Sequence, residues 1–234
     1  MKMIFALMLT IMLPAICFGQ ADEKAAVLPP EVFLQELRRP LRQDVWGEIT
    51  GRIQHVNAEG KSLEGELRVR ITFTSTSMHA QLVLNNQNVY AFEQQHKPQE
   101  KVTSALSMPE KEVAPGLFSF GLEPEDLTFS FLYWDFLEEL PAQKSRMRDC
   151  RVMKLAHPHG TGTVEVWFDA AMGFPMAAFW YHQNQEKPWR ALEMKGAKRH
   201  ENGLWFVKEM RLEGENWKTR VLFDFASLKE VGNK

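Results

Sequence analysis

The stretch from Leu63 to Phe73 changes from apolar or glycine to charged or polar at every step. Leu67, Val69 and Ile71 occupy one phase of this alternation, and glutamate, arginine and threonine occupy the other. A period of two is typical of a β-strand with one buried face and one face in water. Because one strand, or even one hairpin, cannot bury such a face alone, the chain must provide further strands and an apolar cover.

Similar segments recur along the whole chain, with residues of turn chemistry such as Asn57–Gly60 and Glu201–Gly203 between them. The other segments that we interpret as strands are 45–53, 78–84, 89–93, 101–107, 146–155, 163–168, 175–182, 189–196, 204–212 and 216–225. Even spacing with a turn at each break predicts an antiparallel meander of about ten or eleven strands. The predicted fold class is therefore mainly β (α+β), with one strongly curved sheet or barrel.

Near the N-terminus the apolar period changes to that of a helix. Pro29 and Pro30 suit a first helical turn, and Pro40 should end the helix. Between them, apolar residues recur at helical spacing at Val32, Phe33, Leu37 and Leu41. We expect an amphipathic helix here.

A second helical segment interrupts the predicted strands in the middle of the chain. Glu123, Glu125 and Asp126 surround Pro124, as is typical of a helix N-terminus, where acidic side chains compensate the helix dipole. We predict a helix from Pro124 to about Tyr133 and a second short turn through Leu140. Both helical segments are expected to cover one opening of the curved sheet.

The first residues have the layout of a cleavable export signal. A basic residue, Lys2, precedes an apolar run from Ile4 to Ile16, and small residues follow up to Ala21. This run is too short to span a membrane, and it predicts a signal peptide over residues 1–21, a single domain over residues 22–234 and a periplasmic location. Cys17 leaves a lipoprotein signal open as an alternative, although the residues before it do not suit one.

Several function classes find no support in the sequence. The formal net charge is −2 without a concentrated basic face, which argues against nucleic-acid binding. No nucleophile, phosphate-loop or zinc motif is present, so we predict no enzyme, no catalytic residues and no cofactor. His157 and His159 flank a proline, but no nearby cysteine or acid completes a metal site, and we predict no metal. Without Cys17, Cys150 has no partner for an intramolecular disulfide.

The main functional hypothesis comes from the large number of apolar aromatic residues, since the chain has 16 Phe and 7 Trp. Apolar faces that meet inside a wide barrel line a ligand cavity, whereas a narrower arrangement gives an ordinary packed core. Both alternatives remain open on pattern alone. Trp167 lies on the opposite phase from its neighbour Val166 and is left out of the lining. The candidate lining residues, with Phe131 and Trp134 as lid contacts, are Leu67, Val69, Ile71, Phe73, Leu82, Leu84, Phe131, Trp134, Val164, Val166 and Phe168.

A set of short motifs in a fixed order runs from Gly121 to Phe225. In order, they are Glu125-Asp126-Leu127, Phe131-Leu132-Tyr133-Trp134, the strand 148–155, Val164-Glu165-Val166-Trp167-Phe168-Asp169 and Gly173-Phe174-Pro175. This stretch resembles the outer-membrane lipoprotein-sorting protein family, which has the LolA-like fold. No arginine of this sequence is matched to the one that locks the lid of the family's carriers.

The resemblance implies a half-open, strongly curved antiparallel β-barrel with helices as a lid over an apolar hollow. It also implies a non-catalytic, monomeric periplasmic carrier that binds the acyl chains of lipids or lipoproteins, with envelope membrane proteins as further partners. The alternative is an envelope interaction or sensor module that has the same fold and a filled core.

Overall fold

The computed structural model describes residues 28–38, 45–95, 103–158, 160, 162–199 and 205–230. The predicted signal peptide, residues 1–21, lies outside these ranges, as do Pro40, Leu41 and His159. In the described ranges, no helix is long and apolar enough to cross a membrane.

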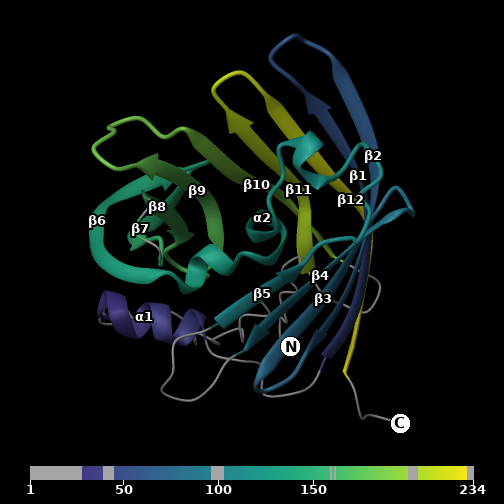
Figure 1. The fold of residues 1–234 in the computed structure, drawn as a ribbon. Helices are drawn as coiled ribbons and strands as arrows, with labels where there is room; N and C mark the ends of the chain where they lie inside the picture. Colours follow the sequence, from purple (N-terminus) through teal and green to yellow (C-terminus); the bar gives the residue numbers. More distant parts are fainter. Residues whose placement is uncertain are drawn as a thin grey trace.

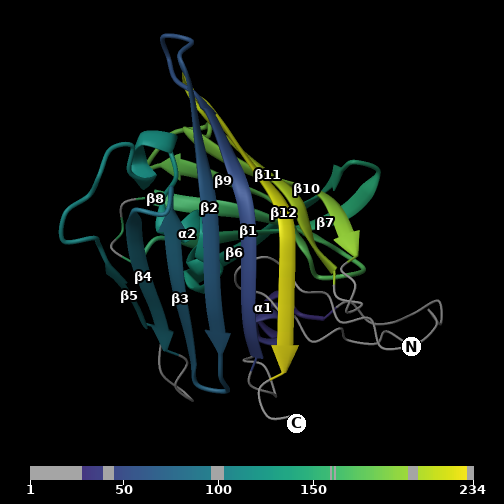
Figure 2. The ribbon, with the colours of Figure 1, turned by 90° about the vertical axis from the view of Figure 1, so that its right-hand side faces the viewer.

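The described strands form one antiparallel sheet of twelve strands, in the order β5-β4-β3-β2-β1-β12-β11-β10-β9-β8-β7-β6. Strands that follow each other in the chain pair with each other, except β5 and β6, and the β1–β12 ladder joins the two halves (Figures 1 and 2). The strands are β1 (Val45–Val56), β2 (Ser62–Phe73), β3 (Ser77–Leu84), β4 (Asn88–Gln95), β5 (Thr103–Ser107), β6 (Asp135–Ser145), β7 (Arg148–Ala156), β8 (Gly162–Asp169), β9 (Pro175–His182), β10 (Arg190–Arg199), β11 (Trp205–Gly214) and β12 (Lys218–Glu230).

The two edge strands of the sheet, β5 and β6, follow each other in the chain. The segment between them, residues 108–134, therefore has to pass from one edge of the sheet to the other. It contains η1 (Leu117–Phe120), α2 (Pro124–Thr128) and η2 (Ser130–Tyr133), and α2 lies within the curve of the sheet (Figure 1). The prediction of a half-open, strongly curved antiparallel sheet with a helical cover is confirmed.

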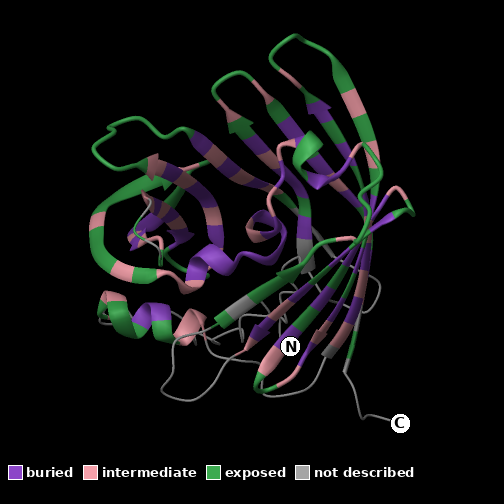
Figure 3. Ribbon diagram, viewed as in Figure 1, coloured by how far each residue is buried: buried purple, intermediate pink, exposed green. Residues whose placement is uncertain are grey.

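Burial along β2 follows the alternation in its sequence. Val69 and Ile71 are buried, while Arg68 and Arg70 are exposed, and the same striping continues across neighbouring strands (Figure 3). Val69 pairs with Ile49 on β1 and with Leu82 on β3. The apolar phase of the strands thus forms the concave inner face, and the charged phase forms the outer face.

The predicted helix from Pro124 to about Tyr133 is present but divided into α2 and η2, and the predicted turn through Leu140 is wrong. Phe129 has φ 53°, a left-handed conformation that ends α2 and separates it from η2. Residues 135–145 then form β6, the strand that raises the count from the expected ten or eleven to twelve. Pro141 is tolerated in β6 because this is an edge strand, and the pairing with β7 shifts register between Leu140 and Gln143.

The expected N-terminal helix is confirmed as α1 (Pro30–Leu37), which begins with proline in its first turn. Phe33 and Leu34 are buried, whereas Val32, which we expected on the apolar face, is exposed. The Phe33 ring meets Phe168 of β8 edge-on at 5.6 Å and lies beneath the Arg151 guanidinium at 4.4 Å. α1 therefore lies against the β7–β8 part of the sheet.

Candidate functional site

The inner face of the sheet is covered by residues 117–133, which we call the insert. Its buried apolar side chains lie in one continuous cluster with those of the inner face. The buried members from the insert are Leu117, Phe120, Leu122, Leu127, Phe129, Phe131 and Leu132. The hollow formed by the curved sheet is thus occupied by the protein's own side chains.

The structure brings the candidate lining residues together in this cluster. Those on strands are Leu67, Val69, Ile71, Phe73, Leu82, Leu84, Val164, Val166 and Phe168, and each is at most 8% exposed. Phe131 of the insert is fully buried, with its ring edge-on to Trp180 at 5.1 Å. Trp134 packs at the margin of the cluster, with its ring 4.5 Å from that of His157. Contact of these residues with a ligand stays a proposal.

Trp167 lies on the outer face, where its ring meets Phe179 of β9 at 5.3 Å. A separate hollow of about 320 Å³ crosses β2 to β5, and its wall includes Arg70, His79 and Glu93. None of the candidate lining residues belongs to this wall. Among the described residues, no three His, Cys, Asp or Glu side chains gather as metal ligands.

Arg190, at the start of β10, connects the sheet to the insert from inside the molecule. Its side chain is 2% exposed, and its guanidinium pairs with Glu123 at 3.1 Å and with the fully buried Asp126. It also donates a hydrogen bond to the Gly121 carbonyl at 3.0 Å. Three indole rings surround it, with centroids 5.4 to 5.9 Å away, from Trp180, Trp189 and Trp217. The insert is therefore held here by a charge pair sealed from water.

The acidic residues lie at the N-terminus of α2, as the sequence predicts, and two of them also make contacts that it does not predict. Glu123 and Asp126 form a capping box, in which the Glu123 N–H donates to Asp126 Oδ2 at 2.7 Å. The pairing of Asp126 with Arg190 joins residues 64 positions apart. No local pattern carries such a contact, so Arg190 could not be predicted from the sequence.

Burial raises the pKa of Asp126 to about 7, against the opposing effect of the Arg190 cation. In the unfolded chain this carboxyl has its ordinary pKa of 3.8. Between about pH 4 and 7 the folded state therefore keeps a proton that the unfolded state has lost. The contribution of Asp126 to the free energy of unfolding is highest below this window and falls as the pH rises through it.

We expect Asp126→Asn to remove this dependence, so that the stability difference between variant and wild type changes steadily from pH 5 to pH 7.5. Denaturant unfolding at a series of pH values measures it. Burial lowers the pKa of His55, so its contribution to the free energy of unfolding changes with pH in the opposite direction, but His55 is present in both proteins and its effect cancels in the difference. A difference that is constant with pH would contradict the prediction.

Arg38, directly after α1, holds the other end of the insert. Its Nε donates to the Leu132 carbonyl at 2.7 Å, and its Nη2 donates to the Trp134 carbonyl at 2.8 Å. Burial lowers the pKa of this guanidinium. The role of Arg38 could not be predicted from the sequence either, because its position after a helix does not indicate which carbonyls it contacts.

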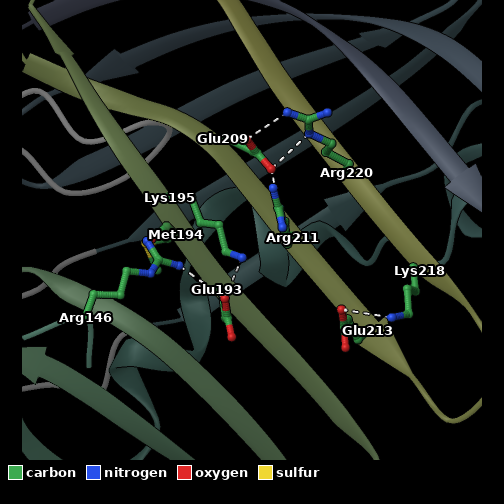
Figure 4. A network of polar contacts seen from close by, with 9 residues as sticks. All are labelled: Arg146, Glu193, Met194, Lys195, Glu209, Arg211, Glu213, Lys218 and Arg220. Atoms are coloured by element: carbon green, nitrogen blue, oxygen red, sulfur yellow. Dashed lines mark hydrogen bonds and ion pairs between the residues drawn. The ribbon is translucent and has the colours of Figure 1, made fainter. Parts of the chain in front are cut away.

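We expect Arg38→Met to leave the sheet intact and to speed hydrogen exchange of the amides of Leu132 and Trp134, which lie at the end of the insert that Arg38 holds. The matched control is Arg146→Met. Arg146 also donates to a backbone carbonyl, that of Met194 at 2.8 Å, but on the outer face (Figure 4). Equal exchange at the insert in both variants would contradict a holding role for Arg38.

The outer face of β10 to β12 is covered by charge pairs of a different kind. Glu209 accepts hydrogen bonds from Arg220 and Arg211, and Glu213 pairs with Lys218 at 3.5 Å (Figure 4). Most of these side chains are well exposed, and such pairs contribute little to stability. Because these charged side chains are hydrated, the outer face can remain exposed to water. The inner face is therefore the surface of the sheet that needs an apolar cover.

No protein-family model matches the sequence, and no curated protein matches it. Solved structures do match. An outer membrane lipoprotein-sorting protein domain from Vibrio parahaemolyticus aligns with a TM-score of 0.57 at 12% identity, over 81% of this chain and 87% of its own. The chain has a LolA-like fold.

Two further solved structures align with the chain as well. A LolA-superfamily protein from Nitrosomonas europaea gives a TM-score of 0.57 at 10% identity, over 87% of this chain and 95% of its own. A DUF1329 family protein from Desulfovibrio piger gives a TM-score of 0.63 at 15% identity, over 87% of this chain and 91% of its own. At these identities the likeness concerns the fold alone, and it confirms the resemblance predicted from residues 121–225.

Proposed function

We propose that the protein is a periplasmic carrier of acyl chains, of the outer-membrane lipoprotein-sorting kind, that works without catalysis. One observation carries the proposal. The buried inner face of an open sheet is formed mainly by apolar side chains, and its cover is an insert that runs between the two free edges. Arg190 gives the insert polar attachments at Gly121, Glu123 and Asp126, and Arg38 gives it one at its C-terminal end.

The energetics of this arrangement allow an acyl chain to replace the insert on the inner face of the sheet. Each methylene of an acyl chain gains about 0.8 kcal/mol when it leaves water for an apolar surface. The insert already gains a similar benefit from side chains such as Phe129 and Phe131. A ligand that displaces them replaces one apolar cover by another, so the net cost is concentrated in the few polar attachments. Binding and release then depend on how firmly those attachments hold.

The proposed partners are the acyl chains of lipids or lipoproteins, with envelope membrane proteins as donors and acceptors of the cargo. The predicted export signal agrees with a monomeric carrier that works between two membranes. The outer face of β10 to β12 agrees with this as well, because it presents exposed charged pairs to water.

The test is the mass of the mature protein, purified from an envelope extract and measured under native conditions. The proposal predicts bound species with lipid masses that disappear after extraction with organic solvent. A protein that is purified empty and that also takes up no fluorescent fatty acid would refute it.

A second candidate is the interaction or sensor module on the same fold. The observation that favours it is the filled core, because the candidate lining residues on the strands already pack at 8% exposure or less. This candidate predicts a protein partner in a pull-down from the envelope and no lipid in either preparation. Recovery of lipid with the protein would count against it.

A further inference from the structure

The inner phase of β4 contains more polar side chains than the rest of the buried face. Along this strand, Asn88, Tyr90, Phe92 and Gln94 point inward and are buried. Neighbouring β3 presents only apolar residues on the same face, at Met78, Ala80, Leu82 and Leu84. Buried polar groups are unfavourable unless they are hydrogen-bonded, so each one on β4 should have a partner.

Two of the three have partners, and these come from the segment that leads into the insert. The Asn88 side chain donates to the Val113 carbonyl at 2.6 Å and accepts from its N–H at 2.7 Å. The Tyr90 hydroxyl accepts the Leu117 N–H at 2.8 Å and donates to Glu112. The buried polar side chains at the Asn88 end of β4 thus have hydrogen-bond partners in residues 112–117.

Gln94 is the exception. Its side chain is 1% exposed, and neither Oε1 nor Nε2 has a hydrogen-bond partner. It stands opposite Met78 on β3 and Ser104 on the edge strand β5, at the other end of β4 from Asn88. A carboxamide with both functions unpaired lies on the apolar inner face, one strand from a free edge of the sheet.

We infer that Gln94 binds the amide linkage of an N-acylated ligand whose hydrocarbon chain lies along the inner face, an inference that rests on the proposed carrier function. An amide offers one N–H donor to Gln94 Oε1 and one carbonyl acceptor to Nε2, so both orphan functions are satisfied at once. An ester has no donor and leaves Oε1 unpaired. A carboxylate likewise offers acceptors only.

The site therefore selects by linkage chemistry, whereas the apolar face selects by chain length. An unpaired buried donor or acceptor lowers affinity by about tenfold, as in other sites built to hydrogen-bond a ligand. An apolar residue at position 94 would remove the selection. It would also remove the buried, unpaired carboxamide, so it should not destabilise the protein without ligand.

The first experiment compares N-(2-hydroxyethyl)palmitamide with 2-hydroxyethyl palmitate, which differ only in N–H against O, by displacement of a fluorescent fatty acid from the wild-type protein. The expected result is about tenfold tighter binding of the amide. Equal binding of the two overturns the inference but leaves the carrier function standing. Binding of neither, with no uptake of the fluorescent fatty acid, overturns both.

The second experiment uses Gln94→Met, with Asn88→Met as the matched control. Gln94→Met should bind amide and ester equally and should unfold at the same temperature as wild type or higher. Asn88→Met, which breaks hydrogen bonds that are made, should unfold at a lower temperature. A Gln94→Met protein that keeps its preference for the amide, or that is destabilised like the control, overturns the inference.

Acylated N-termini of proteins and free N-acyl lipids both contain this linkage. A third measurement, with a five-residue peptide palmitoylated at its N-terminus, separates the two sources. Binding at least as tight as that of the small amide assigns the site to acylated protein N-termini. Tight binding of the small amide together with exclusion of the peptide assigns it to free N-acyl lipids, and both results support the amide site.

Discussion

Replacing Arg190 with methionine is expected to lower the free energy of unfolding by about 3–5 kcal/mol. The reason is that Asp126 is fully buried and would lose the cation that compensates its charge. The loss should be largest near pH 8, because the pKa of Asp126 is about 7 and the carboxylate is then ionised in the wild type. Urea unfolding of the two proteins at pH 8 measures the difference.

The matched control is Arg52→Met on the outer face. Arg52 also forms two hydrogen bonds with one carboxylate, at 3.0 Å each to Asp224, but both side chains are well exposed. Water and salt screen such a pair, so only a small loss is expected. Equal losses for the two variants would contradict the importance that we assign to the buried pair, and with it the anchoring of the insert to β10.

Phe131→Ala is the second change with a large expected effect, a loss of about 3–5 kcal/mol in the free energy of unfolding. Phe131 is fully buried, and its ring packs against Trp180 and, at 5.8 Å, against Phe129. Removing the ring leaves a cavity between the insert and the sheet. The control is Phe118→Ala in η1, a phenylalanine that is 53% exposed, for which a change within about 0.5 kcal/mol is expected.

The same pair of variants bears on function. If the insert competes with an acyl chain for the inner face, Phe131→Ala weakens the competitor, and the variant should take up a fluorescent fatty acid faster than wild type. Phe118→Ala should take it up at the wild-type rate. Slower uptake by Phe131→Ala, in protein that is still folded, would contradict the proposed competition.

The parts of the fold that the sequence predicted are those in which a local period reports burial. The alternation along β2 and the helical period of α1 predicted both elements, because each element buries one face, although Val32 lies outside the buried face of α1. β6 was missed because its burial does not alternate. As a mostly exposed edge strand with a proline, it has no apolar period, and its pairing with β7 defines it. The left-handed conformation of Phe129, which ends α2, could not be predicted from the sequence either, since this conformation is rare for a bulky residue.

The candidate site was predictable only in part, for a related reason. The phase of Val164, Val166 and Phe168 indicates an inner face, and that face exists as a buried cluster. What packs across it depends on contacts between distant segments. Arg38 and Arg190 reach the insert from elements far away in the chain, and no spacing in the sequence signals either contact. Gln94 carried a weak signal, because one more step of the alternation beyond the predicted strand 89–93 places this polar residue in the apolar phase.

The most direct test of the carrier account is hydrogen exchange of the protein with and without a saturating palmitoyl ligand. The account predicts that amides of the insert, such as those of Ser119 and Leu132, which are hydrogen-bonded in the ligand-free protein, exchange faster once the ligand occupies the inner face. The ladder amides of β1, β2 and β12 should keep their protection. A bound ligand that leaves the insert as protected as before, or the absence of any saturable binding, would contradict the account.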